Sequence, residues 1–167
     1  MAPFERITEH LSVDGFRCGN ADLDGWLAES ALNSDRSGTA RVYVWLDQIG
    51  EVNGYFAIAP HMVRREGLPH SVARGSPNVI PGYLLARLAV AESSQGTGNG
   101  GRLLVEALRT TLEAIRVGGG RVIVVDAIDD HAYNFYKHFG FKPIPETDGR
   151  LVMKASTAAA SVGVAWP

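Results

Sequence analysis

The strongest chemical signal in the sequence is a glycine-rich run, QGTGNGG, at residues 95–101. An almost wholly apolar stretch at residues 83–91 precedes it, and a stretch with an apolar stripe at helical spacing follows it at residues 102–117. A glycine turn that opens a helix exposes unpaired backbone N–H groups beside the positive end of the helix dipole, where anions bind. This pattern of strand, glycine turn and helix predicts a phosphate site.

Three phosphate-binding patterns compete for this run. The P-loop pattern requires Gly-Lys-Ser/Thr, which the run lacks. Residues 96–101 satisfy the dinucleotide pattern G-x-G-x-x-G, and Asp126 follows where a ribose-binding acid would stand. That fold needs several further strands, however, and only the 41 residues 127–167 remain to form them. The third pattern, Gln/Arg-x-x-Gly-x-Gly/Ala at residues 95–100, closely resembles the acyl-CoA pyrophosphate loop of the GNAT N-acetyltransferases.

Two further motifs agree with the GNAT resemblance. The stretch LARLAVA at residues 85–91 is similar to that family's central strand, and NFYKHFGF at residues 134–141 is similar to its Asn-x-x-Tyr and FYxxFGF signature. The resemblance implies an enzyme with acetyl-CoA as co-substrate and Tyr136 as the general acid that protonates the leaving CoA thiolate. It also implies cofactor contacts through Leu88, Val90, Gln95, Gly96, Gly98, Gly100, Gly101 and Asn134, with the N–H of Val90 aimed at the thioester carbonyl.

The rest of the chain predicts a mixed α/β domain around this site. A second buried strand at 121–128 makes the centre a parallel βαβ unit. We also predict a helix at 20–36, a hairpin of strands at 40–47 and 51–60, a long loop at 66–81, a short helix at 130–138 and a strand at 149–154. The resemblance implies the GNAT fold, with a mostly antiparallel twisted sheet and flanking helices. The domain is predicted to span residues 1–154, and the alanine-rich segment 155–167 is predicted to be a flexible tail.

Motifs at residues 16–19, 23–27, 54–57 and 80–90 narrow the resemblance to the TacT/AtaT branch of GNAT toxins. Those toxins acetylate the amino group of aminoacyl-tRNA and are silenced by a ribbon-helix-helix antitoxin. The resemblance therefore implies a toxin that blocks translation, with charged tRNA and such an antitoxin as partners, and a homodimer. Two alternatives stay open: a small-molecule or protein N-terminal acetyltransferase, and a non-catalytic acetyl-CoA sensor, which the presence of Tyr136 disfavours.

Charge is distributed unevenly along a chain whose net charge is −2. Residues 61–125 hold eight arginines and four glutamates, a balance of +4, and arginine is the side chain best suited to bidentate phosphate contacts. The tRNA-contact candidates are Arg64, Arg65, Arg74 and Arg87. A plain preference for arginine is the alternative explanation, because the whole chain has 13 Arg and three Lys.

Cysteine usage and hydropathy exclude several protein classes. A single cysteine, Cys18, excludes a disulfide scaffold, and no Cys/His spacing suits zinc, so no metal is expected. The charged N-terminus and the lack of an apolar run of about 18 residues predict a cytoplasmic protein without a membrane span.

Cys18 could carry an acyl group, but a buried structural cysteine is favoured. No general base stands out, and an α-amine, with a pKa of about 7.7–8.0, is partly neutral without one.

Overall fold

The computed structural model describes residues 4–166. Residues 1–3 and 167, which belong to the predicted domain and tail, lie outside the described residues. The chain forms two compact units: the first is built from the chain up to Ala59 and from Ala86–Ala107, and the second from Pro60–Leu85 and from Leu108 onward.

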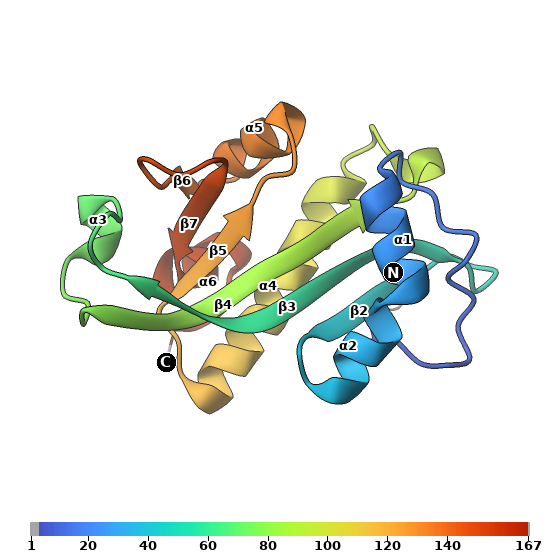
Figure 1. The fold of residues 1–167 in the computed structure, drawn as a ribbon, viewed down its shortest axis with the longest axis horizontal. Helices are drawn as coiled ribbons and strands as arrows, with labels where there is room; N and C mark the ends of the chain where they lie inside the picture. The colour runs from blue at the N-terminus through green and yellow to red at the C-terminus, as the bar shows by residue number, and fades with distance from the viewer. Residues whose placement is uncertain (1–3, 167) are drawn as a thin grey trace. The chain divides into compact units, whose positions relative to one another are not determined.

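Strands and helices are interspersed along the described residues (Figure 1). Their order is β1 (Phe4–Arg6), α1 (Ala21–Glu29), α2 (Ala31–Ser37), β2 (Arg41–Leu46), β3 (Val52–Arg64), α3 (His70–Ala73), β4 (Val79–Val90), the 3-10 turn η1 (Glu92–Ser94), α4 (Asn99–Gly118), β5 (Val122–Asp126), α5 (Asp130–His138), β6 (Lys142–Pro143), β7 (Arg150–Lys154) and α6 (Ala155–Val162). The strands form a sheet in the order β1-β2-β3-β4-β5-β7-β6, with β4 and β5 as a parallel pair. The predicted mixed α/β class, the mostly antiparallel sheet and the parallel βαβ unit are confirmed.

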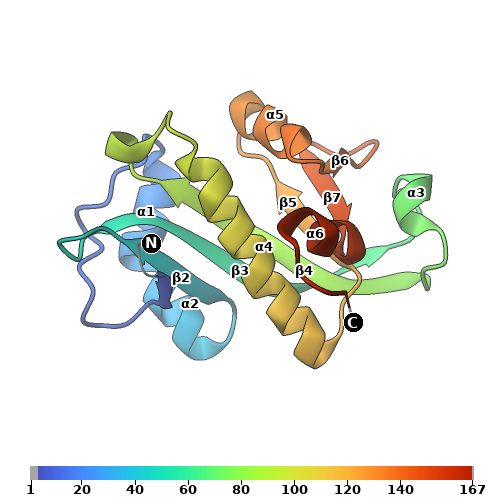
Figure 2. The same cartoon turned by 180° about the vertical axis from the view of Figure 1, so that it is seen from behind.

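In the first unit, helices cover both faces of β2 and β3. Helices α1 and α2 lie on one face, and the first turns of α4 lie on the other (Figures 1 and 2). The Asn20 side chain caps α1 by accepting a hydrogen bond from the N–H of Leu23 at 3.0 Å. The single helix predicted over residues 20–36 is divided at Ser30, whose backbone leaves helical geometry between α1 and α2.

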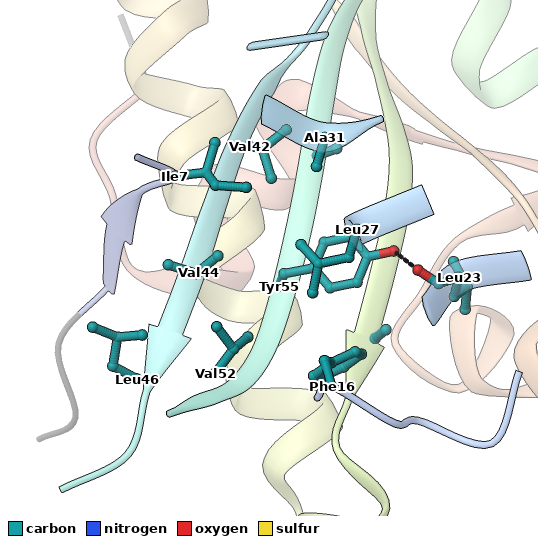
Figure 3. Packing of buried hydrophobic residues seen from close by; sticks show 12 residues of the cluster. Ile7, Phe16, Leu23, Leu27, Ala31, Val42, Val44, Leu46, Val52 and Tyr55 are labelled. Atoms are coloured by element: carbon teal, nitrogen blue, oxygen red, sulfur yellow. Dashed lines mark hydrogen bonds between the residues drawn. The ribbon is translucent and has the colours of Figure 1, made fainter. Parts of the chain in front are cut away.

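The core of the first unit gathers around Tyr55 of β3. Figure 3 shows its ring among apolar side chains of α1, α2, β2 and β3, with its hydroxyl pointing at the carbonyl of Leu23, to which it donates at 2.6 Å. Ala89 of β4 belongs to the same cluster. The core therefore fixes the end of β4, where the predicted acetyl-CoA contacts begin.

In the second unit, a close approach of β4 and β5 requires a glycine. Gly82 pairs with Val122, and a Cβ at Gly82 would lie 2.2 Å from the Val122 carbonyl oxygen. β5 also pairs with β7, in antiparallel register. A core of aliphatic side chains forms around these strands: Val72, Ile80, Val122, Val124, Ile144 and Val152.

The prediction of a flexible tail from residue 155 needs correction. Helix α6 occupies Ala155–Val162, and Ala155, Ala158, Ala159 and Val162 are buried. Arg109 and Arg116 of α4 donate to the carbonyls of Val162 and Ala165, each at 3.3 Å. Alanine is the best helix former, and its small side chain lets this helix pack closely although the segment has no pattern of polar and apolar residues. The domain boundary at residue 154 stays a prediction.

The predicted loop at 66–81 is shorter than expected. β3 continues to Arg64, β4 begins at Val79, and α3 with its buried Val72 lies between them. Along Pro60–Arg64 exposed and half-buried residues alternate, which is the pattern of a strand with one solvated face. In the described part of the chain no helix is long and apolar enough to cross a membrane, and no group of three or more His, Cys, Asp or Glu side chains is placed to hold a metal ion.

Candidate active site

The glycine loop presents its backbone outward between η1 and the start of α4. Gly96 and Gly98 have φ values of 82° and 83°, and a Cβ at either position would meet no atom within 4 Å. Glycine is therefore favoured at these two positions by the positive φ, and not by a lack of room for a side chain. The Gly98 carbonyl accepts the first helical hydrogen bond, from the N–H of Arg102 at 3.2 Å.

Backbone N–H groups of the loop are unpaired. Within residues 4–166, the N–H groups of residues 96–101 have no hydrogen-bond acceptor. These donors stand at the N-terminus of a 20-residue helix, where the dipole adds a positive partial charge. The loop thus fits a pyrophosphate, and its contact through Gly96, Gly98, Gly100 and Gly101 stays a prediction.

Gln95 ties the loop to two other segments. Its Nε2 donates to the carbonyl of Cys18 at 2.7 Å and to the carbonyl of Val90 at 2.8 Å. Asn99 adds a second tie, because its Nδ2 donates to the Ser94 carbonyl at 2.9 Å. Gln95 therefore orients the loop from outside and holds the end of β4 at the same time.

The end of β4 carries Leu88 and Val90 beyond its pairing with β5, which covers Gly82–Leu85. The N–H of Ala91 donates to the Asn53 carbonyl of β3 at 2.9 Å. Because the direction of backbone groups alternates along a strand, the N–H groups of Leu88 and Val90 point to the opposite edge of β4. The assignment of these main-chain groups to the pantetheine arm stays a prediction of the resemblance.

Tyr136 lies on α5, in the second unit. The Asp129 side chain caps this helix by accepting from the N–H of Ala132 at 2.8 Å. The Tyr136 ring is 7% exposed and meets Phe135 and Phe141 edge-on, with centroids 5.4 and 5.6 Å away. Its hydroxyl has no hydrogen-bond partner among the described residues. Burial raises the pKa of Tyr136, so the hydroxyl stays protonated at neutral pH and can act as a donor.

The arginine candidates divide into two groups. Arg64, Arg65 and Arg74 line one pocket of about 610 Å³ around α3, in the second unit. Arg65 donates to the Ser76 carbonyl at 2.9 Å, whereas the side chains of Arg64 and Arg74 make no hydrogen bond or ion pair with described residues. Arg87 does not line this pocket; its guanidinium lies over the ring of Trp26 in the first unit. Asn134 is an exposed residue of α5.

A polar network that sequence analysis missed joins β3, β5 and β7. Arg150 donates to both carboxylate oxygens of Asp126 at 2.8 Å, and its Nη1 lies 3.1 Å from Nε2 of His61. Because arginine only donates, Nε2 of His61 is the acceptor; burial and the Arg150 charge lower the pKa of His61. Asp126 is thus held in an ion pair, not free as a ribose-binding acid would be. Opposite charges at facing positions of two predicted strands, Asp126 and Arg150, are the signal that could have found it.

Cys18 has the environment of a structural thiol. Its Sγ lies 3.6 Å from the Asn20 carbonyl, and burial, together with Asp24, raises the pKa of Cys18 to about 11. A thiol with so high a pKa carries little thiolate at neutral pH, and the thiolate is the nucleophile. The geometry favours the structural alternative over an acyl carrier.

Comparisons with known proteins identify the family of the chain. Residues 38–143 match the acetyltransferase (GNAT) domain. The chain is 35% identical over 158 residues to a tRNA-acetylating toxin of Mycobacterium tuberculosis, covering 95% of each protein. It is similar to the structure of AtaT complexed with acetyl-methionyl-tRNA, with a TM-score of 0.86 and 26% identity over 96% of this chain and 98% of that one. It is also similar to AtaTR bound with acetyl-CoA, with a TM-score of 0.82 and 25% identity over 95% and 96% of the two chains. The chain therefore belongs to the GNAT acetyltransferase family.

Proposed function

We propose that this protein transfers the acetyl group of acetyl-CoA to the α-amino group of aminoacyl-tRNA and thereby acts as a toxin that blocks translation. The observation that carries the proposal is the 35% identity to a tRNA-acetylating toxin along 95% of both chains. The similarity to AtaT complexed with acetyl-methionyl-tRNA supports the same acceptor. The unpaired amides of residues 96–101 support acetyl-CoA as the donor.

The residues divide the chemistry between binding and proton transfer. The glycine loop binds the pyrophosphate, and the main-chain groups of Leu88 and Val90 hold the pantetheine arm, with the Val90 N–H stabilising the oxyanion. The amine nitrogen attacks the thioester carbonyl carbon, an amide bond forms and the C–S bond breaks. The Tyr136 hydroxyl gives its proton to the departing thiolate, and the proton lost by the amine returns to solvent and then to Tyr136.

Arginines supply the contacts to nucleic acid. The pocket lined by Arg64, Arg65 and Arg74 presents three guanidinium groups with Glu66 as the acidic side chain beside them. A local excess of positive charge binds phosphates even on a chain whose net charge is −2. Arg64 and Arg74, which have no partner among the described residues, are the side chains most available to phosphates.

The partners follow from the same proposal. Charged tRNA is made in the cytoplasm, so the protein works there. A toxin that acetylates charged tRNA requires a silencing partner, which we assign to a ribbon-helix-helix antitoxin on the resemblance to the TacT/AtaT toxins. The active form is a homodimer on the same ground. Co-expression with the product of a short neighbouring gene of that class tests the antitoxin, and light scattering of the purified protein tests the dimer.

Incubation of the purified protein with radiolabelled acetyl-CoA and total charged tRNA tests the proposed reaction. We expect label in the aminoacyl group of the tRNA, and Tyr136→Phe should lower turnover roughly 100-fold while acetyl-CoA affinity stays unchanged. Label found only in small amines or peptide N-termini would instead show the small-molecule or N-terminal acetyltransferase.

A double variant, in which two arginines are replaced together, tests the arginine pocket. Arg64→Gln with Arg74→Gln should weaken acetylation of charged tRNA and reduce its salt slope by roughly one for each lost phosphate contact, because fewer counterions are released. Arg36→Gln is the matched control, since Arg36 is exposed and pairs with Glu9 at 2.9 Å. If the double variant and the wild type have the same salt dependence, this pocket is not part of the tRNA interface.

A further inference from the structure

The guanidinium of Arg87 rests on a stack of aromatic rings. Its Cζ lies 4.9 Å from the centroid of the Trp26 ring, and Trp26 stacks on Tyr55 with centroids 6.1 Å apart and planes 10° apart. Phe16 closes the stack, edge-on to Tyr55 at 5.5 Å. Tyr55 is fully buried, and its hydroxyl is fixed by the Leu23 carbonyl at 2.6 Å. The support under Arg87 is therefore part of the core of the first unit.

Arg87 has no counter-ion. Its Nη1 donates to the neighbouring Ala86 carbonyl at 2.8 Å, and no carboxylate of the described residues forms an ion pair with it. A guanidinium has five N–H donors, so the remaining donors are available to a docked group. Stacking on an aromatic face holds the planar fork in one orientation, which suits bidentate binding of a phosphate.

The position of Arg87 on β4 indicates which part of the acceptor it meets. It directly precedes Leu88 and stands three residues before Val90, about 10 Å along the strand. These are the residues assigned to the thioester arm, so a phosphate bound by Arg87 lies near the reacting amine. In aminoacyl-tRNA the phosphates nearest the amino group are those of the 3′-terminal nucleotides.

We propose that Arg87 binds a phosphate of the 3′-terminal nucleotides of charged tRNA, and that Trp26 is a positioning residue that fixes the Arg87 guanidinium. This inference rests on the proposed function and adds to it a contact that is distinct in kind from the exposed arginine pocket. Arg87 recognises the end that carries the amino acid, whereas Arg64 and Arg74 bind phosphates without regard to that end.

Three acceptors of decreasing phosphate content test the role of Arg87. They are charged tRNA, an aminoacylated CCA trinucleotide and a 3′-aminoacyl adenosine without phosphate. Arg87→Gln should raise KM for the first two acceptors roughly tenfold to 100-fold, the range for hydrogen bonds between charged groups. It should leave turnover of the aminoacyl adenosine and the affinity for acetyl-CoA unchanged. Arg36→Gln, the control variant, should leave all three acceptors unaffected.

Variants of Trp26 separate positioning from folding. Trp26→Leu keeps an apolar side chain but removes the aromatic face, and should raise KM for the phosphate-containing acceptors roughly threefold to 30-fold, as expected for loss of a partly desolvated cation–π contact. Trp26→Phe should restore most of the affinity. The phosphate-free acceptor is the internal control, because a general disturbance of the fold would lower its turnover as well.

The outcomes distinguish the inference from the proposed function. If the wild type acetylates charged tRNA and Arg87→Gln does so with the same KM, the Arg87 contact is refuted and the proposed function stands. If Trp26→Leu lowers turnover equally for all three acceptors, Trp26 has a structural role only, and its positioning role is refuted. If the wild type acetylates neither charged tRNA nor the trinucleotide, the proposed function fails, and the inference fails with it.

Discussion

Replacement of Gln95 by methionine separates the orientation of the glycine loop from its contacts with acetyl-CoA. Methionine keeps the length of the side chain but has no N–H, so the hydrogen bonds to the carbonyls of Val90 and Cys18 are both lost. A neutral hydrogen bond contributes about 1 kcal/mol, and the bond to Cys18 is exposed, so the combined loss is about 1–2 kcal/mol. Because the loosened loop must be ordered again on binding, the acetyl-CoA Kd should rise roughly fivefold to 30-fold.

Calorimetric titration with acetyl-CoA measures this change, and denaturant unfolding of the same variant reports whether the fold persists. Ser93→Met is the matched control: Ser93 is exposed two residues earlier, and its hydroxyl has no hydrogen-bond partner among the described residues. Its acetyl-CoA affinity should equal that of the wild type. An unchanged Kd for folded Gln95→Met would refute the idea that the loop is oriented by its outside ties.

Three other changes follow from the geometry. Gly82→Ala brings a Cβ to 2.2 Å from the Val122 carbonyl oxygen and should lower the free energy of unfolding by about 1–3 kcal/mol. A denaturant titration measures this change, and an unfolding midpoint equal to that of the wild type would contradict the close approach. Cys18→Ser should transfer acetyl groups at the wild-type rate. Because the pKa of the Cys18 thiol is about 11, the thiol of the wild type should react with iodoacetamide at pH 8 far more slowly in the folded protein than in denaturant. Rapid alkylation of the folded protein would refute this. His61 has a lowered pKa in the folded state, so its contribution to stability is complete above about pH 6.5 and is lost as the pH falls through the lower folded value. The unfolding free energy of His61→Gln should therefore depend less on pH between 5 and 7 than that of the wild type. Parallel plots of unfolding free energy against pH for the two proteins would show that His61 does not cause the pH dependence.

Local signals in the sequence were sufficient for the elements that carry the site. Helix α5 occupies the predicted residues 130–138, because Asp129, the apolar spacing and Gly140 mark both of its ends. Helix α4 begins at Asn99, three residues before the predicted start, since glycines in its first turn hide the helical pattern. The resemblance to GNAT toxins, based on short motifs, is confirmed by the family match and by the 35% identical toxin.

Contacts between distant segments were beyond a single sequence. Gln95 acts through carbonyls at residues 18 and 90, and nothing in the local pattern shows that these approach each other. The four arginine candidates look alike in the sequence, yet three line a pocket and Arg87 stacks on a tryptophan 61 positions earlier, at residue 26. Such differences arise from tertiary packing, which assigns separate environments to residues of the same type.

The environments of the titratable groups bear on the choice of acceptor. Nε2 of His61 is occupied by Arg150, Asp126 is held in an ion pair, and Cys18 remains protonated, so these three groups are poorly suited to deprotonate an amine. An acceptor that arrives with a neutral amine needs none of these three groups. At pH 7.4 an α-amine with a pKa near 7.8 is about 28% neutral, whereas a lysine with a pKa near 10.4 is about 0.1% neutral. This difference, roughly 300-fold in reactive amine, favours the α-amino group of a charged tRNA over protein lysines before any binding contact is made.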